Sequence, residues 1–166
     1  VLRGQEEKEF SITRATISNP RVALDLRENV AIMAISRFDG ETGTLARKYA
    51  QQIKNQGISK LVLDLRGNGG GYVTAAQAVA SLWLNEKSLI VTEKKGTKVI
   101  DEVRATGDNV LADTETIVLA DESSASASEI VVGALKDNKK AQIYGVKTYG
   151  KGSVQEPIDM KNGALL

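Results

Sequence analysis

The chain contains no histidine and no cysteine among its 166 residues. Without histidine it cannot contain a Ser-His-Asp triad, so any general base must be another side chain. Without cysteine, thiol catalysis, disulfides and cysteine-based zinc sites are excluded, and the redox compartment is left open. If the protein is an enzyme, its chemistry therefore depends on serine, threonine, lysine, tyrosine, carboxylates or backbone amides.

Aromatic residues are also scarce, at 4% of the chain, and the formal net charge is only +1. A protein that binds nucleic acid usually has a strong basic excess or an aromatic stacking surface, so we expect no nucleic-acid partner. No apolar run reaches the roughly 18 residues that a membrane-spanning helix needs. The remaining composition, 42% hydrophobic and 26% charged, is typical of a globular domain with its own core.

Apolar patterning predicts strands that alternate with helices. Short apolar runs between turn residues indicate strands, and apolar stripes at intervals of three to four residues indicate helices. The expected strands are 22–26, 30–35, 61–65, 89–92, 97–103, 117–120, 142–144 and 153–155. The expected helices are 42–56, capped by Thr42 or Thr44, 73–84 and 125–137. This order predicts an α/β domain with a partly parallel sheet, preceded by a short hairpin within residues 1–14.

A glycine-rich loop, residues 67–71, follows the apolar run 61–65. Glycines allow backbone N–H groups to approach a bound group closely, as an oxyanion hole or a phosphate cradle requires. The loop is equally compatible with a tight connection between a strand and a helix. A dinucleotide-binding fingerprint is excluded, because Tyr72 occupies the position of its last glycine.

Four serines lie between the apolar run 117–120 and the first turn of the third expected helix: Ser123, Ser124, Ser126 and Ser128. The first N–H groups of a helix are unpaired and its dipole favours negative charge there. A serine at this place can attack a carbonyl while a neighbouring N–H stabilises the oxyanion. Ser126 and Glu129 also fit the S-x-x-E capping box, so a purely structural role is the competing interpretation.

The segment 145–155, with the sequence GVKTYGKGSVQ, imitates a phosphate-binding Walker A loop. Gly152 stands where that loop requires serine or threonine, and Pro157 disfavours the helix that must follow. Phosphate binding is therefore the less favoured of the functions that this segment suggests.

A lysine is the usual base for a serine nucleophile when histidine is absent. At neutral pH a lysine is protonated unless burial in an apolar pocket lowers its pKa. Lys151 is the best candidate because the glycines on both sides allow close backbone approach. Lys139, Lys140 and Lys147 have more polar neighbours in the sequence and are weaker candidates.

Together the three segments resemble the catalytic domain of carboxyl-terminal processing proteases, which are serine peptidases with a Ser/Lys dyad. The motifs that carry the resemblance are DLRGNGGG at 64–71, SASASEI at 124–130 and GVKTYGKGSVQ at 145–155. The resemblance implies a ClpP/crotonase-like mixed sheet with packed helices. It also implies Ser126 as nucleophile, Lys151 as base and Gln155 as the hydrogen-bond partner of that lysine.

The resemblance further implies hydrolysis through an acyl-enzyme, without a metal or a cofactor. Its oxyanion hole would consist of the Ala127 N–H and an N–H of the glycine loop, from Gly70 or Gly71. Asp137 is expected to give structural support rather than to take part in catalysis.

Residues 1–14 are interpreted as the end of a PDZ domain, and residues 15–166 as the peptidase core, truncated at its C-terminus. Proteases of this family act outside the cytoplasm, usually near a membrane, on the C-terminal regions of protein substrates. We therefore expect a protein or peptide substrate with a free C-terminus, a membrane-associated full-length protein, and weak substrate binding by this chain; a homo-oligomer is compatible with the resemblance. The alternative is a non-catalytic or latent member of the same fold that serves as a binding or assembly module.

Overall fold

The computed structural model describes residues 2–3, 6–7, 9–11, 13 and 20–153. Near the N-terminus β1 (Leu2–Arg3) pairs with β2 (Glu6–Glu7) in antiparallel fashion, as the expected hairpin requires. The later elements are β3 (Val22–Arg27), β4 (Val30–Ile35), α1 (Thr42–Asn55), β5 (Lys60–Asp64), α2 (Val73–Ala80), β6 (Leu89–Lys95), β7 (Lys98–Arg104), β8 (Glu115–Ala120), α3 (Ala127–Asp137) and β9 (Gln142–Gly145).

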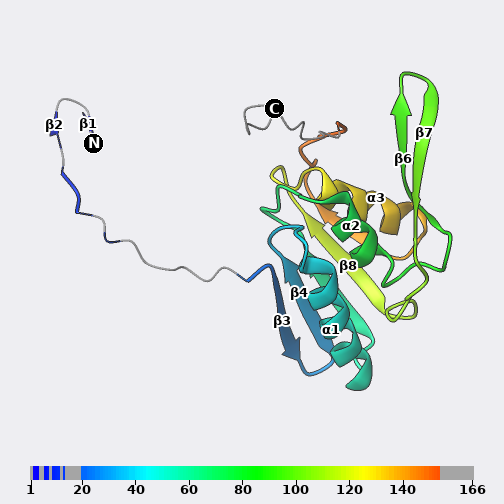
Figure 1. Ribbon diagram of the computed structural model, residues 1–166. Coiled ribbons are helices and arrows are strands. Elements are labelled where there is room, and N and C mark those ends of the chain that lie inside the picture. Colours follow the sequence, from blue (N-terminus) through cyan, green and yellow to red (C-terminus); the bar gives the residue numbers. More distant parts are fainter. Residues whose placement is uncertain (1, 4–5, 8, 12, 14–19, 154–166) are drawn as a thin grey trace.

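The main sheet has five strands in the order β3-β4-β5-β8-β9. β3 pairs antiparallel with β4, and the other neighbours pair in parallel. The prediction of an α/β domain with a partly parallel sheet is thus confirmed. The parallel pairs arise because α1 connects β4 to β5, a longer crossover containing α2 connects β5 to β8, and α3 connects β8 to β9 (Figure 1).

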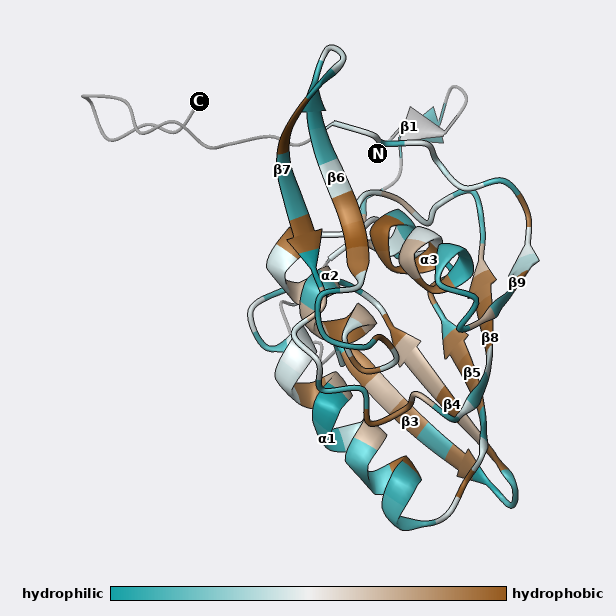
Figure 2. Ribbon diagram, turned by 90° about the vertical axis from the view of Figure 1, so that its right-hand side faces the viewer, coloured by the Kyte–Doolittle hydropathy of each residue, from teal (hydrophilic) through white to brown (hydrophobic). Residues whose placement is uncertain are grey.

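All three helices cover one face of this sheet (Figures 1 and 2). Side chains alternate along each strand, so every second residue faces the helices. The inward residues of the two central strands, Leu61 and Leu63 on β5 and Val118 on β8, are almost fully buried. On the opposite face Ile32, Val62 and Ile117 lie side by side in register and are only half-buried.

Three details differ from the sequence-based expectations. Helix α2 ends at Ala80, and the buried Trp83 that continued its apolar spacing lies in the turn that follows. Thr42 is the first residue of α1 rather than its cap; its hydroxyl accepts the Asp39 N–H (2.9 Å). The segments 89–92 and 97–103 form a separate hairpin, β6–β7, that projects from the body (Figure 1).

No helix within the described part of the chain combines the length and apolar character needed to cross a membrane.

Candidate active site

The three motifs meet at one edge of the main sheet. The glycine loop follows β5, the serine segment (residues 121–129) follows β8, and the segment with Lys151 (residues 146–153) follows β9. These three strands are adjacent and parallel, so their carboxyl ends lie together, which is where open α/β sheets usually bind ligands. Parallel pairing thus assembles residues that are far apart in the sequence.

Ser126 stands immediately before α3, with φ 53° and ψ −115°. An ordinary N-cap residue has an extended backbone with negative φ, so capping alone does not require this conformation. A positive φ outside the usual wells costs a non-glycine residue roughly 1–3 kcal/mol and is typical of functional sites. The capping-box contact is also present, because the Ser126 N–H donates to Glu129 Oε2 (2.9 Å). The strained backbone favours the nucleophile interpretation.

Gly70 packs directly against Ser126. A Cβ added to Gly70 would lie 2.8 Å from the Ser126 Cβ and 2.9 Å from the Ala127 nitrogen, and its φ is +98°. Only glycine fits there without displacing Ser126. The glycine loop is therefore more than a tight connection, because it forms the wall beside Ser126.

The predicted oxyanion donors differ in whether their N–H groups are already hydrogen-bonded. The Gly70 N–H donates to Asn68 Oδ1 (2.9 Å) and is therefore already paired. The Ala127 and Gly71 N–H groups donate to no other residue that the structure describes. Of the three expected donors, the Ala127 and Gly71 N–H groups are therefore the ones available to bind an oxyanion.

Asn68 holds the glycine loop in place and was not singled out from the sequence. Its side chain is fully buried, and besides accepting the Gly70 N–H it donates from Nδ2 to the Ile35 carbonyl (2.7 Å). Its own carbonyl accepts hydrogen bonds from the Ala125 N–H (3.0 Å) and the Ser128 hydroxyl (2.9 Å). Asn68 thus joins β4, the glycine loop and the start of α3.

Asp121 and Ser124 form a second connection between the loops. Both carboxylate oxygens of Asp121 accept the Gly67 N–H at 3.0 Å. Hydrogen bonds from Gly67, Ser123 and Ser124 lower the pKa of Asp121 despite partial burial. The buried Ser124 hydroxyl donates to the Leu65 carbonyl (2.8 Å). Ser124 and Ser128 are therefore structural, which separates Ser126 from its neighbours.

Glu129 contacts the segment that carries the predicted base. It accepts hydrogen bonds from the Thr148 hydroxyl (2.8 Å), the Gly150 N–H (2.7 Å) and the Lys151 N–H (2.9 Å). Burial opposes its charge, but these bonds and the one from Ser126 outweigh burial and hold the pKa of Glu129 below its usual value. The structure thus brings the Lys151 backbone to the carboxylate that caps α3.

The structure gives less support to the roles predicted for Lys151, Gln155 and Asp137. Lys151 is exposed, so the apolar pocket expected around this lysine is not formed by the described residues. Gln155 lies outside the described residues. Asp137 is an exposed residue at the end of α3, and its carboxylate makes no hydrogen bond or ion pair within the described range. No helix begins at Lys151–Ser153, where a Walker A loop would lead into one.

A metal site and a cavity elsewhere in the molecule are the alternatives to this edge of the sheet. Residues 20–153 and the short described pieces before them contain no group of three carboxylate side chains suited to a metal ion. A cavity of about 340 Å³ is lined by residues that include Arg47, Thr74 and Thr106, and none of the predicted catalytic residues lines it. The motif-bearing edge of the sheet remains the candidate site.

Comparison with known proteins finds similar sequences and structures. The chain is 34% identical to a probable CtpA-like serine protease of Staphylococcus haemolyticus (strain JCSC1435) and 36% identical to one of Staphylococcus aureus (strain N315). Each match covers all of this chain but only 34% of the relative. The structure of a photosystem II D1 C-terminal processing protease matches with a TM-score of 0.80 and 28% identity, covering 89% of this chain and 42% of that chain. The ClpP/crotonase-like mixed sheet is thereby confirmed. The model of peptidase family S41 matches residues 24–166, and the chain therefore belongs to this family.

Proposed function

We propose that the protein is a serine endopeptidase that cleaves protein substrates near their C-termini with Ser126 as nucleophile and Lys151 as base. One observation carries the proposal: the strained Ser126 backbone packs against Gly70 and is joined through Glu129 to the backbone of Lys151. Membership of family S41 and the similarity to CtpA-like serine proteases support it.

In the proposed acylation step, the neutral Lys151 amine takes the proton of the Ser126 hydroxyl while Oγ forms a bond to the scissile carbonyl carbon. The Ala127 N–H and an N–H of the glycine loop stabilise the resulting oxyanion, at the positive end of α3. The C–N bond then breaks, and the Lys151 ammonium gives its proton to the leaving amine. Gln155 orients the lysine.

In the proposed deacylation step, water loses a proton to Lys151 while its oxygen bonds to the acyl carbon. The bond from that carbon to Ser126 Oγ breaks, and Lys151 returns the proton to the serine. The first product is an amine, the second a carboxylic acid, and the enzyme returns to its starting state.

This mechanism requires Lys151 to lose its proton near neutral pH, which needs removal of water from around it. Since Lys151 is exposed, we propose that bound substrate covers it during the reaction. The same exposure favours the second candidate function, a latent or non-catalytic member of the family that acts as a binding or assembly module.

Hydrolysis of casein by the full-length protein tests the proposal. Ser126→Ala and Lys151→Met should each abolish cleavage without lowering the thermal midpoint, because neither change opens a packed core. Lys147→Met, an exposed lysine in the same segment, is the matched control and should keep full activity. Equal cleavage by all variants would refute the assignment, and no cleavage by any of them would favour the latent module.

We further propose that the substrate has a free C-terminus, and that the full-length protein acts outside the cytoplasm in association with a membrane. The PDZ origin of residues 1–14 belongs to this proposal. Its support is the family membership together with the name of the structural relative, which is a C-terminal processing protease. Fractionation of cells that express the full-length protein tests the location, and recovery in the cytoplasmic fraction would contradict it.

A further inference from the structure

The Glu129 carboxylate connects the two predicted catalytic residues through their backbones. Its Oε2 accepts hydrogen bonds from the Ser126 N–H and the Lys151 N–H, both at 2.9 Å. Its Oε1 accepts the Gly150 N–H at 2.7 Å and the Thr148 hydroxyl at 2.8 Å. We propose that Glu129 is a positioning residue that holds the segment of the base, Lys151, in place beside the nucleophile, Ser126. This inference rests on the proposed function, because it requires Ser126 and Lys151 to be the catalytic pair.

A helix cap alone does not account for these contacts. The capping box requires only the bond between Glu129 and the Ser126 N–H. The other three donors belong to a segment 19 to 22 residues further along the chain and outside α3. Glu129 therefore joins two separate pieces of chain, each of which carries one predicted catalytic residue.

The four donors require an ionised carboxylate. A carboxylate offers about four lone-pair sites and donates nothing, so it suits four converging donors. Hydrogen bonds to a charged acceptor are also roughly twice as strong as neutral ones. A glutamine of the same shape would turn an NH2 group toward two of the donors, whichever way its amide is placed.

The segment that carries Lys151 directs backbone N–H groups toward this carboxylate. Residues 146–153 form no helix or strand. Gly150 has φ +85°, and its N–H and that of Lys151 converge on Glu129, as in the backbone concavities that bind anions. The Tyr149 N–H donates to the Ser124 carbonyl (3.1 Å), which also holds the segment near the serines.

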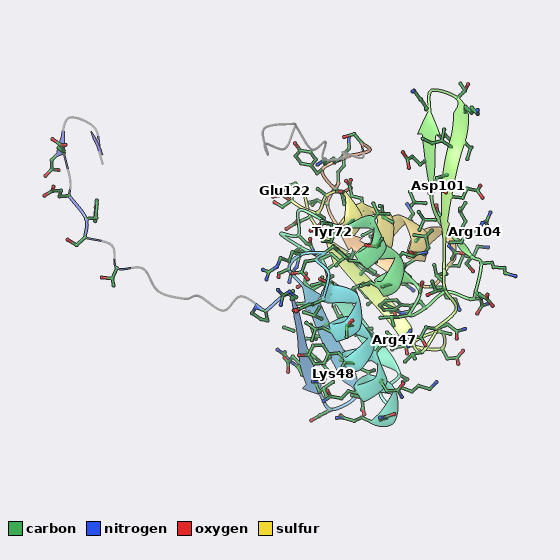
Figure 3. The ribbon with its side chains drawn as sticks, in the orientation of Figure 1. Arg47, Lys48, Tyr72, Asp101, Arg104 and Glu122 are labelled. Atoms are coloured by element: carbon green, nitrogen blue, oxygen red, sulfur yellow. The ribbon has the colours of Figure 1, made fainter. Side chains whose placement is uncertain are left out.

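Glu129→Gln in the full-length protein tests the inference with casein as substrate. A misplacement of about 1 Å between reacting groups costs roughly 100-fold in rate, so kcat should fall by about that factor while KM stays nearly constant. Glu122→Gln is the matched control, because Glu122 is an exposed residue of the serine segment (Figure 3). It should leave both constants unchanged.

Two Thr148 variants provide a graded test that does not depend on tolerance of the Glu129 change. Thr148→Val removes one of the four donors and should lower kcat less than Glu129→Gln does. Thr148→Ser keeps the hydroxyl, so its kcat should stay close to that of the unchanged protein. Equal kcat values for the valine and serine variants would overturn the inference.

Amide hydrogen exchange at Gly150 and Lys151 separates this inference from the proposed function. Both amides should exchange faster in Glu129→Gln than in the unchanged protein, whether or not the protein hydrolyses casein. Faster exchange with an unchanged kcat would overturn the positioning role while leaving the peptidase assignment intact. A lower kcat with unchanged exchange would overturn it as well, because the loss would not act through this segment. If Ser126→Ala retains activity, the peptidase assignment itself fails.

Discussion

Replacement of the buried Asn68 by alanine should destabilise the protein strongly. The change removes the hydrogen bonds from Nδ2 to the Ile35 carbonyl (2.7 Å) and from the Gly70 N–H to Oδ1 (2.9 Å). Each lost partner leaves a backbone group unsatisfied at a cost of roughly 1–3 kcal/mol, so the free energy of unfolding should fall by about 2–6 kcal/mol. That is a large share of the roughly 5–15 kcal/mol that stabilises a typical protein.

Urea unfolding measures this loss. With a slope of about 2 kcal/mol per molar urea, the midpoint should fall by roughly 1–3 M. Asn85→Ala is the matched control, because Asn85 is exposed and its side chain accepts a single hydrogen bond within the described residues, from the Asn109 amide (2.8 Å). Its cost should stay within about 0.5 kcal/mol. Equal losses for the two alanine variants would refute the assignment of Asn68 as the residue that secures the glycine loop.

Two further predictions concern the same loops. Gly70→Ala should abolish casein hydrolysis and lower the thermal midpoint, because its Cβ would lie 2.8 Å from the Ser126 Cβ; Gly69→Ala, with no atom within 4 Å of the added Cβ, should do neither. Similar behaviour of the two variants would contradict the packing argument. The folded-state pKa of Asp121 is lowered chiefly by the Gly67 N–H, so its carboxylate stabilises the fold above the unfolded pKa of about 4 and that stability is lost as the pH falls through the lower folded value. At pH values below about 4, the urea concentration at the unfolding midpoint should therefore decrease. The decrease should be smaller in Asp121→Asn than in the unchanged protein, and an equal decrease in the two proteins would refute this role.

The serine segment shows where reasoning from the sequence succeeded and where it reached its limit. The apolar spacing located α3, and the S-x-x-E pattern correctly paired Ser126 with Glu129. The pattern could not distinguish Ser124 and Ser128 from Ser126, because their partners, Leu65 and Asn68, lie some 60 residues away. Only the fold shows that those two hydroxyls are already bonded.

The properties of the glycine loop were also predicted only in part from the sequence. Its glycines indicated close backbone approach, and Gly70 does lie against Ser126. The sequence could not show that the Gly70 N–H is paired with Asn68, since an asparagine beside a glycine is also typical of an ordinary turn. The expected burial of Lys151 was not found, because burial depends on what packs around a side chain rather than on its flanking glycines.

The sequence by itself predicted most of the strands and helices of the described residues, and it determined the exclusion of histidine and cysteine chemistry and the motifs that identify peptidase family S41. These follow from local periodicity and from residue types, which act over a few positions. The tertiary structure alone decided that three distant loops meet at one sheet edge, that Ser126 has a positive φ, and that Glu129 reaches the Lys151 segment. Those features depend on parallel strand pairing and on hydrogen bonds between residues far apart in the chain, which no local pattern encodes.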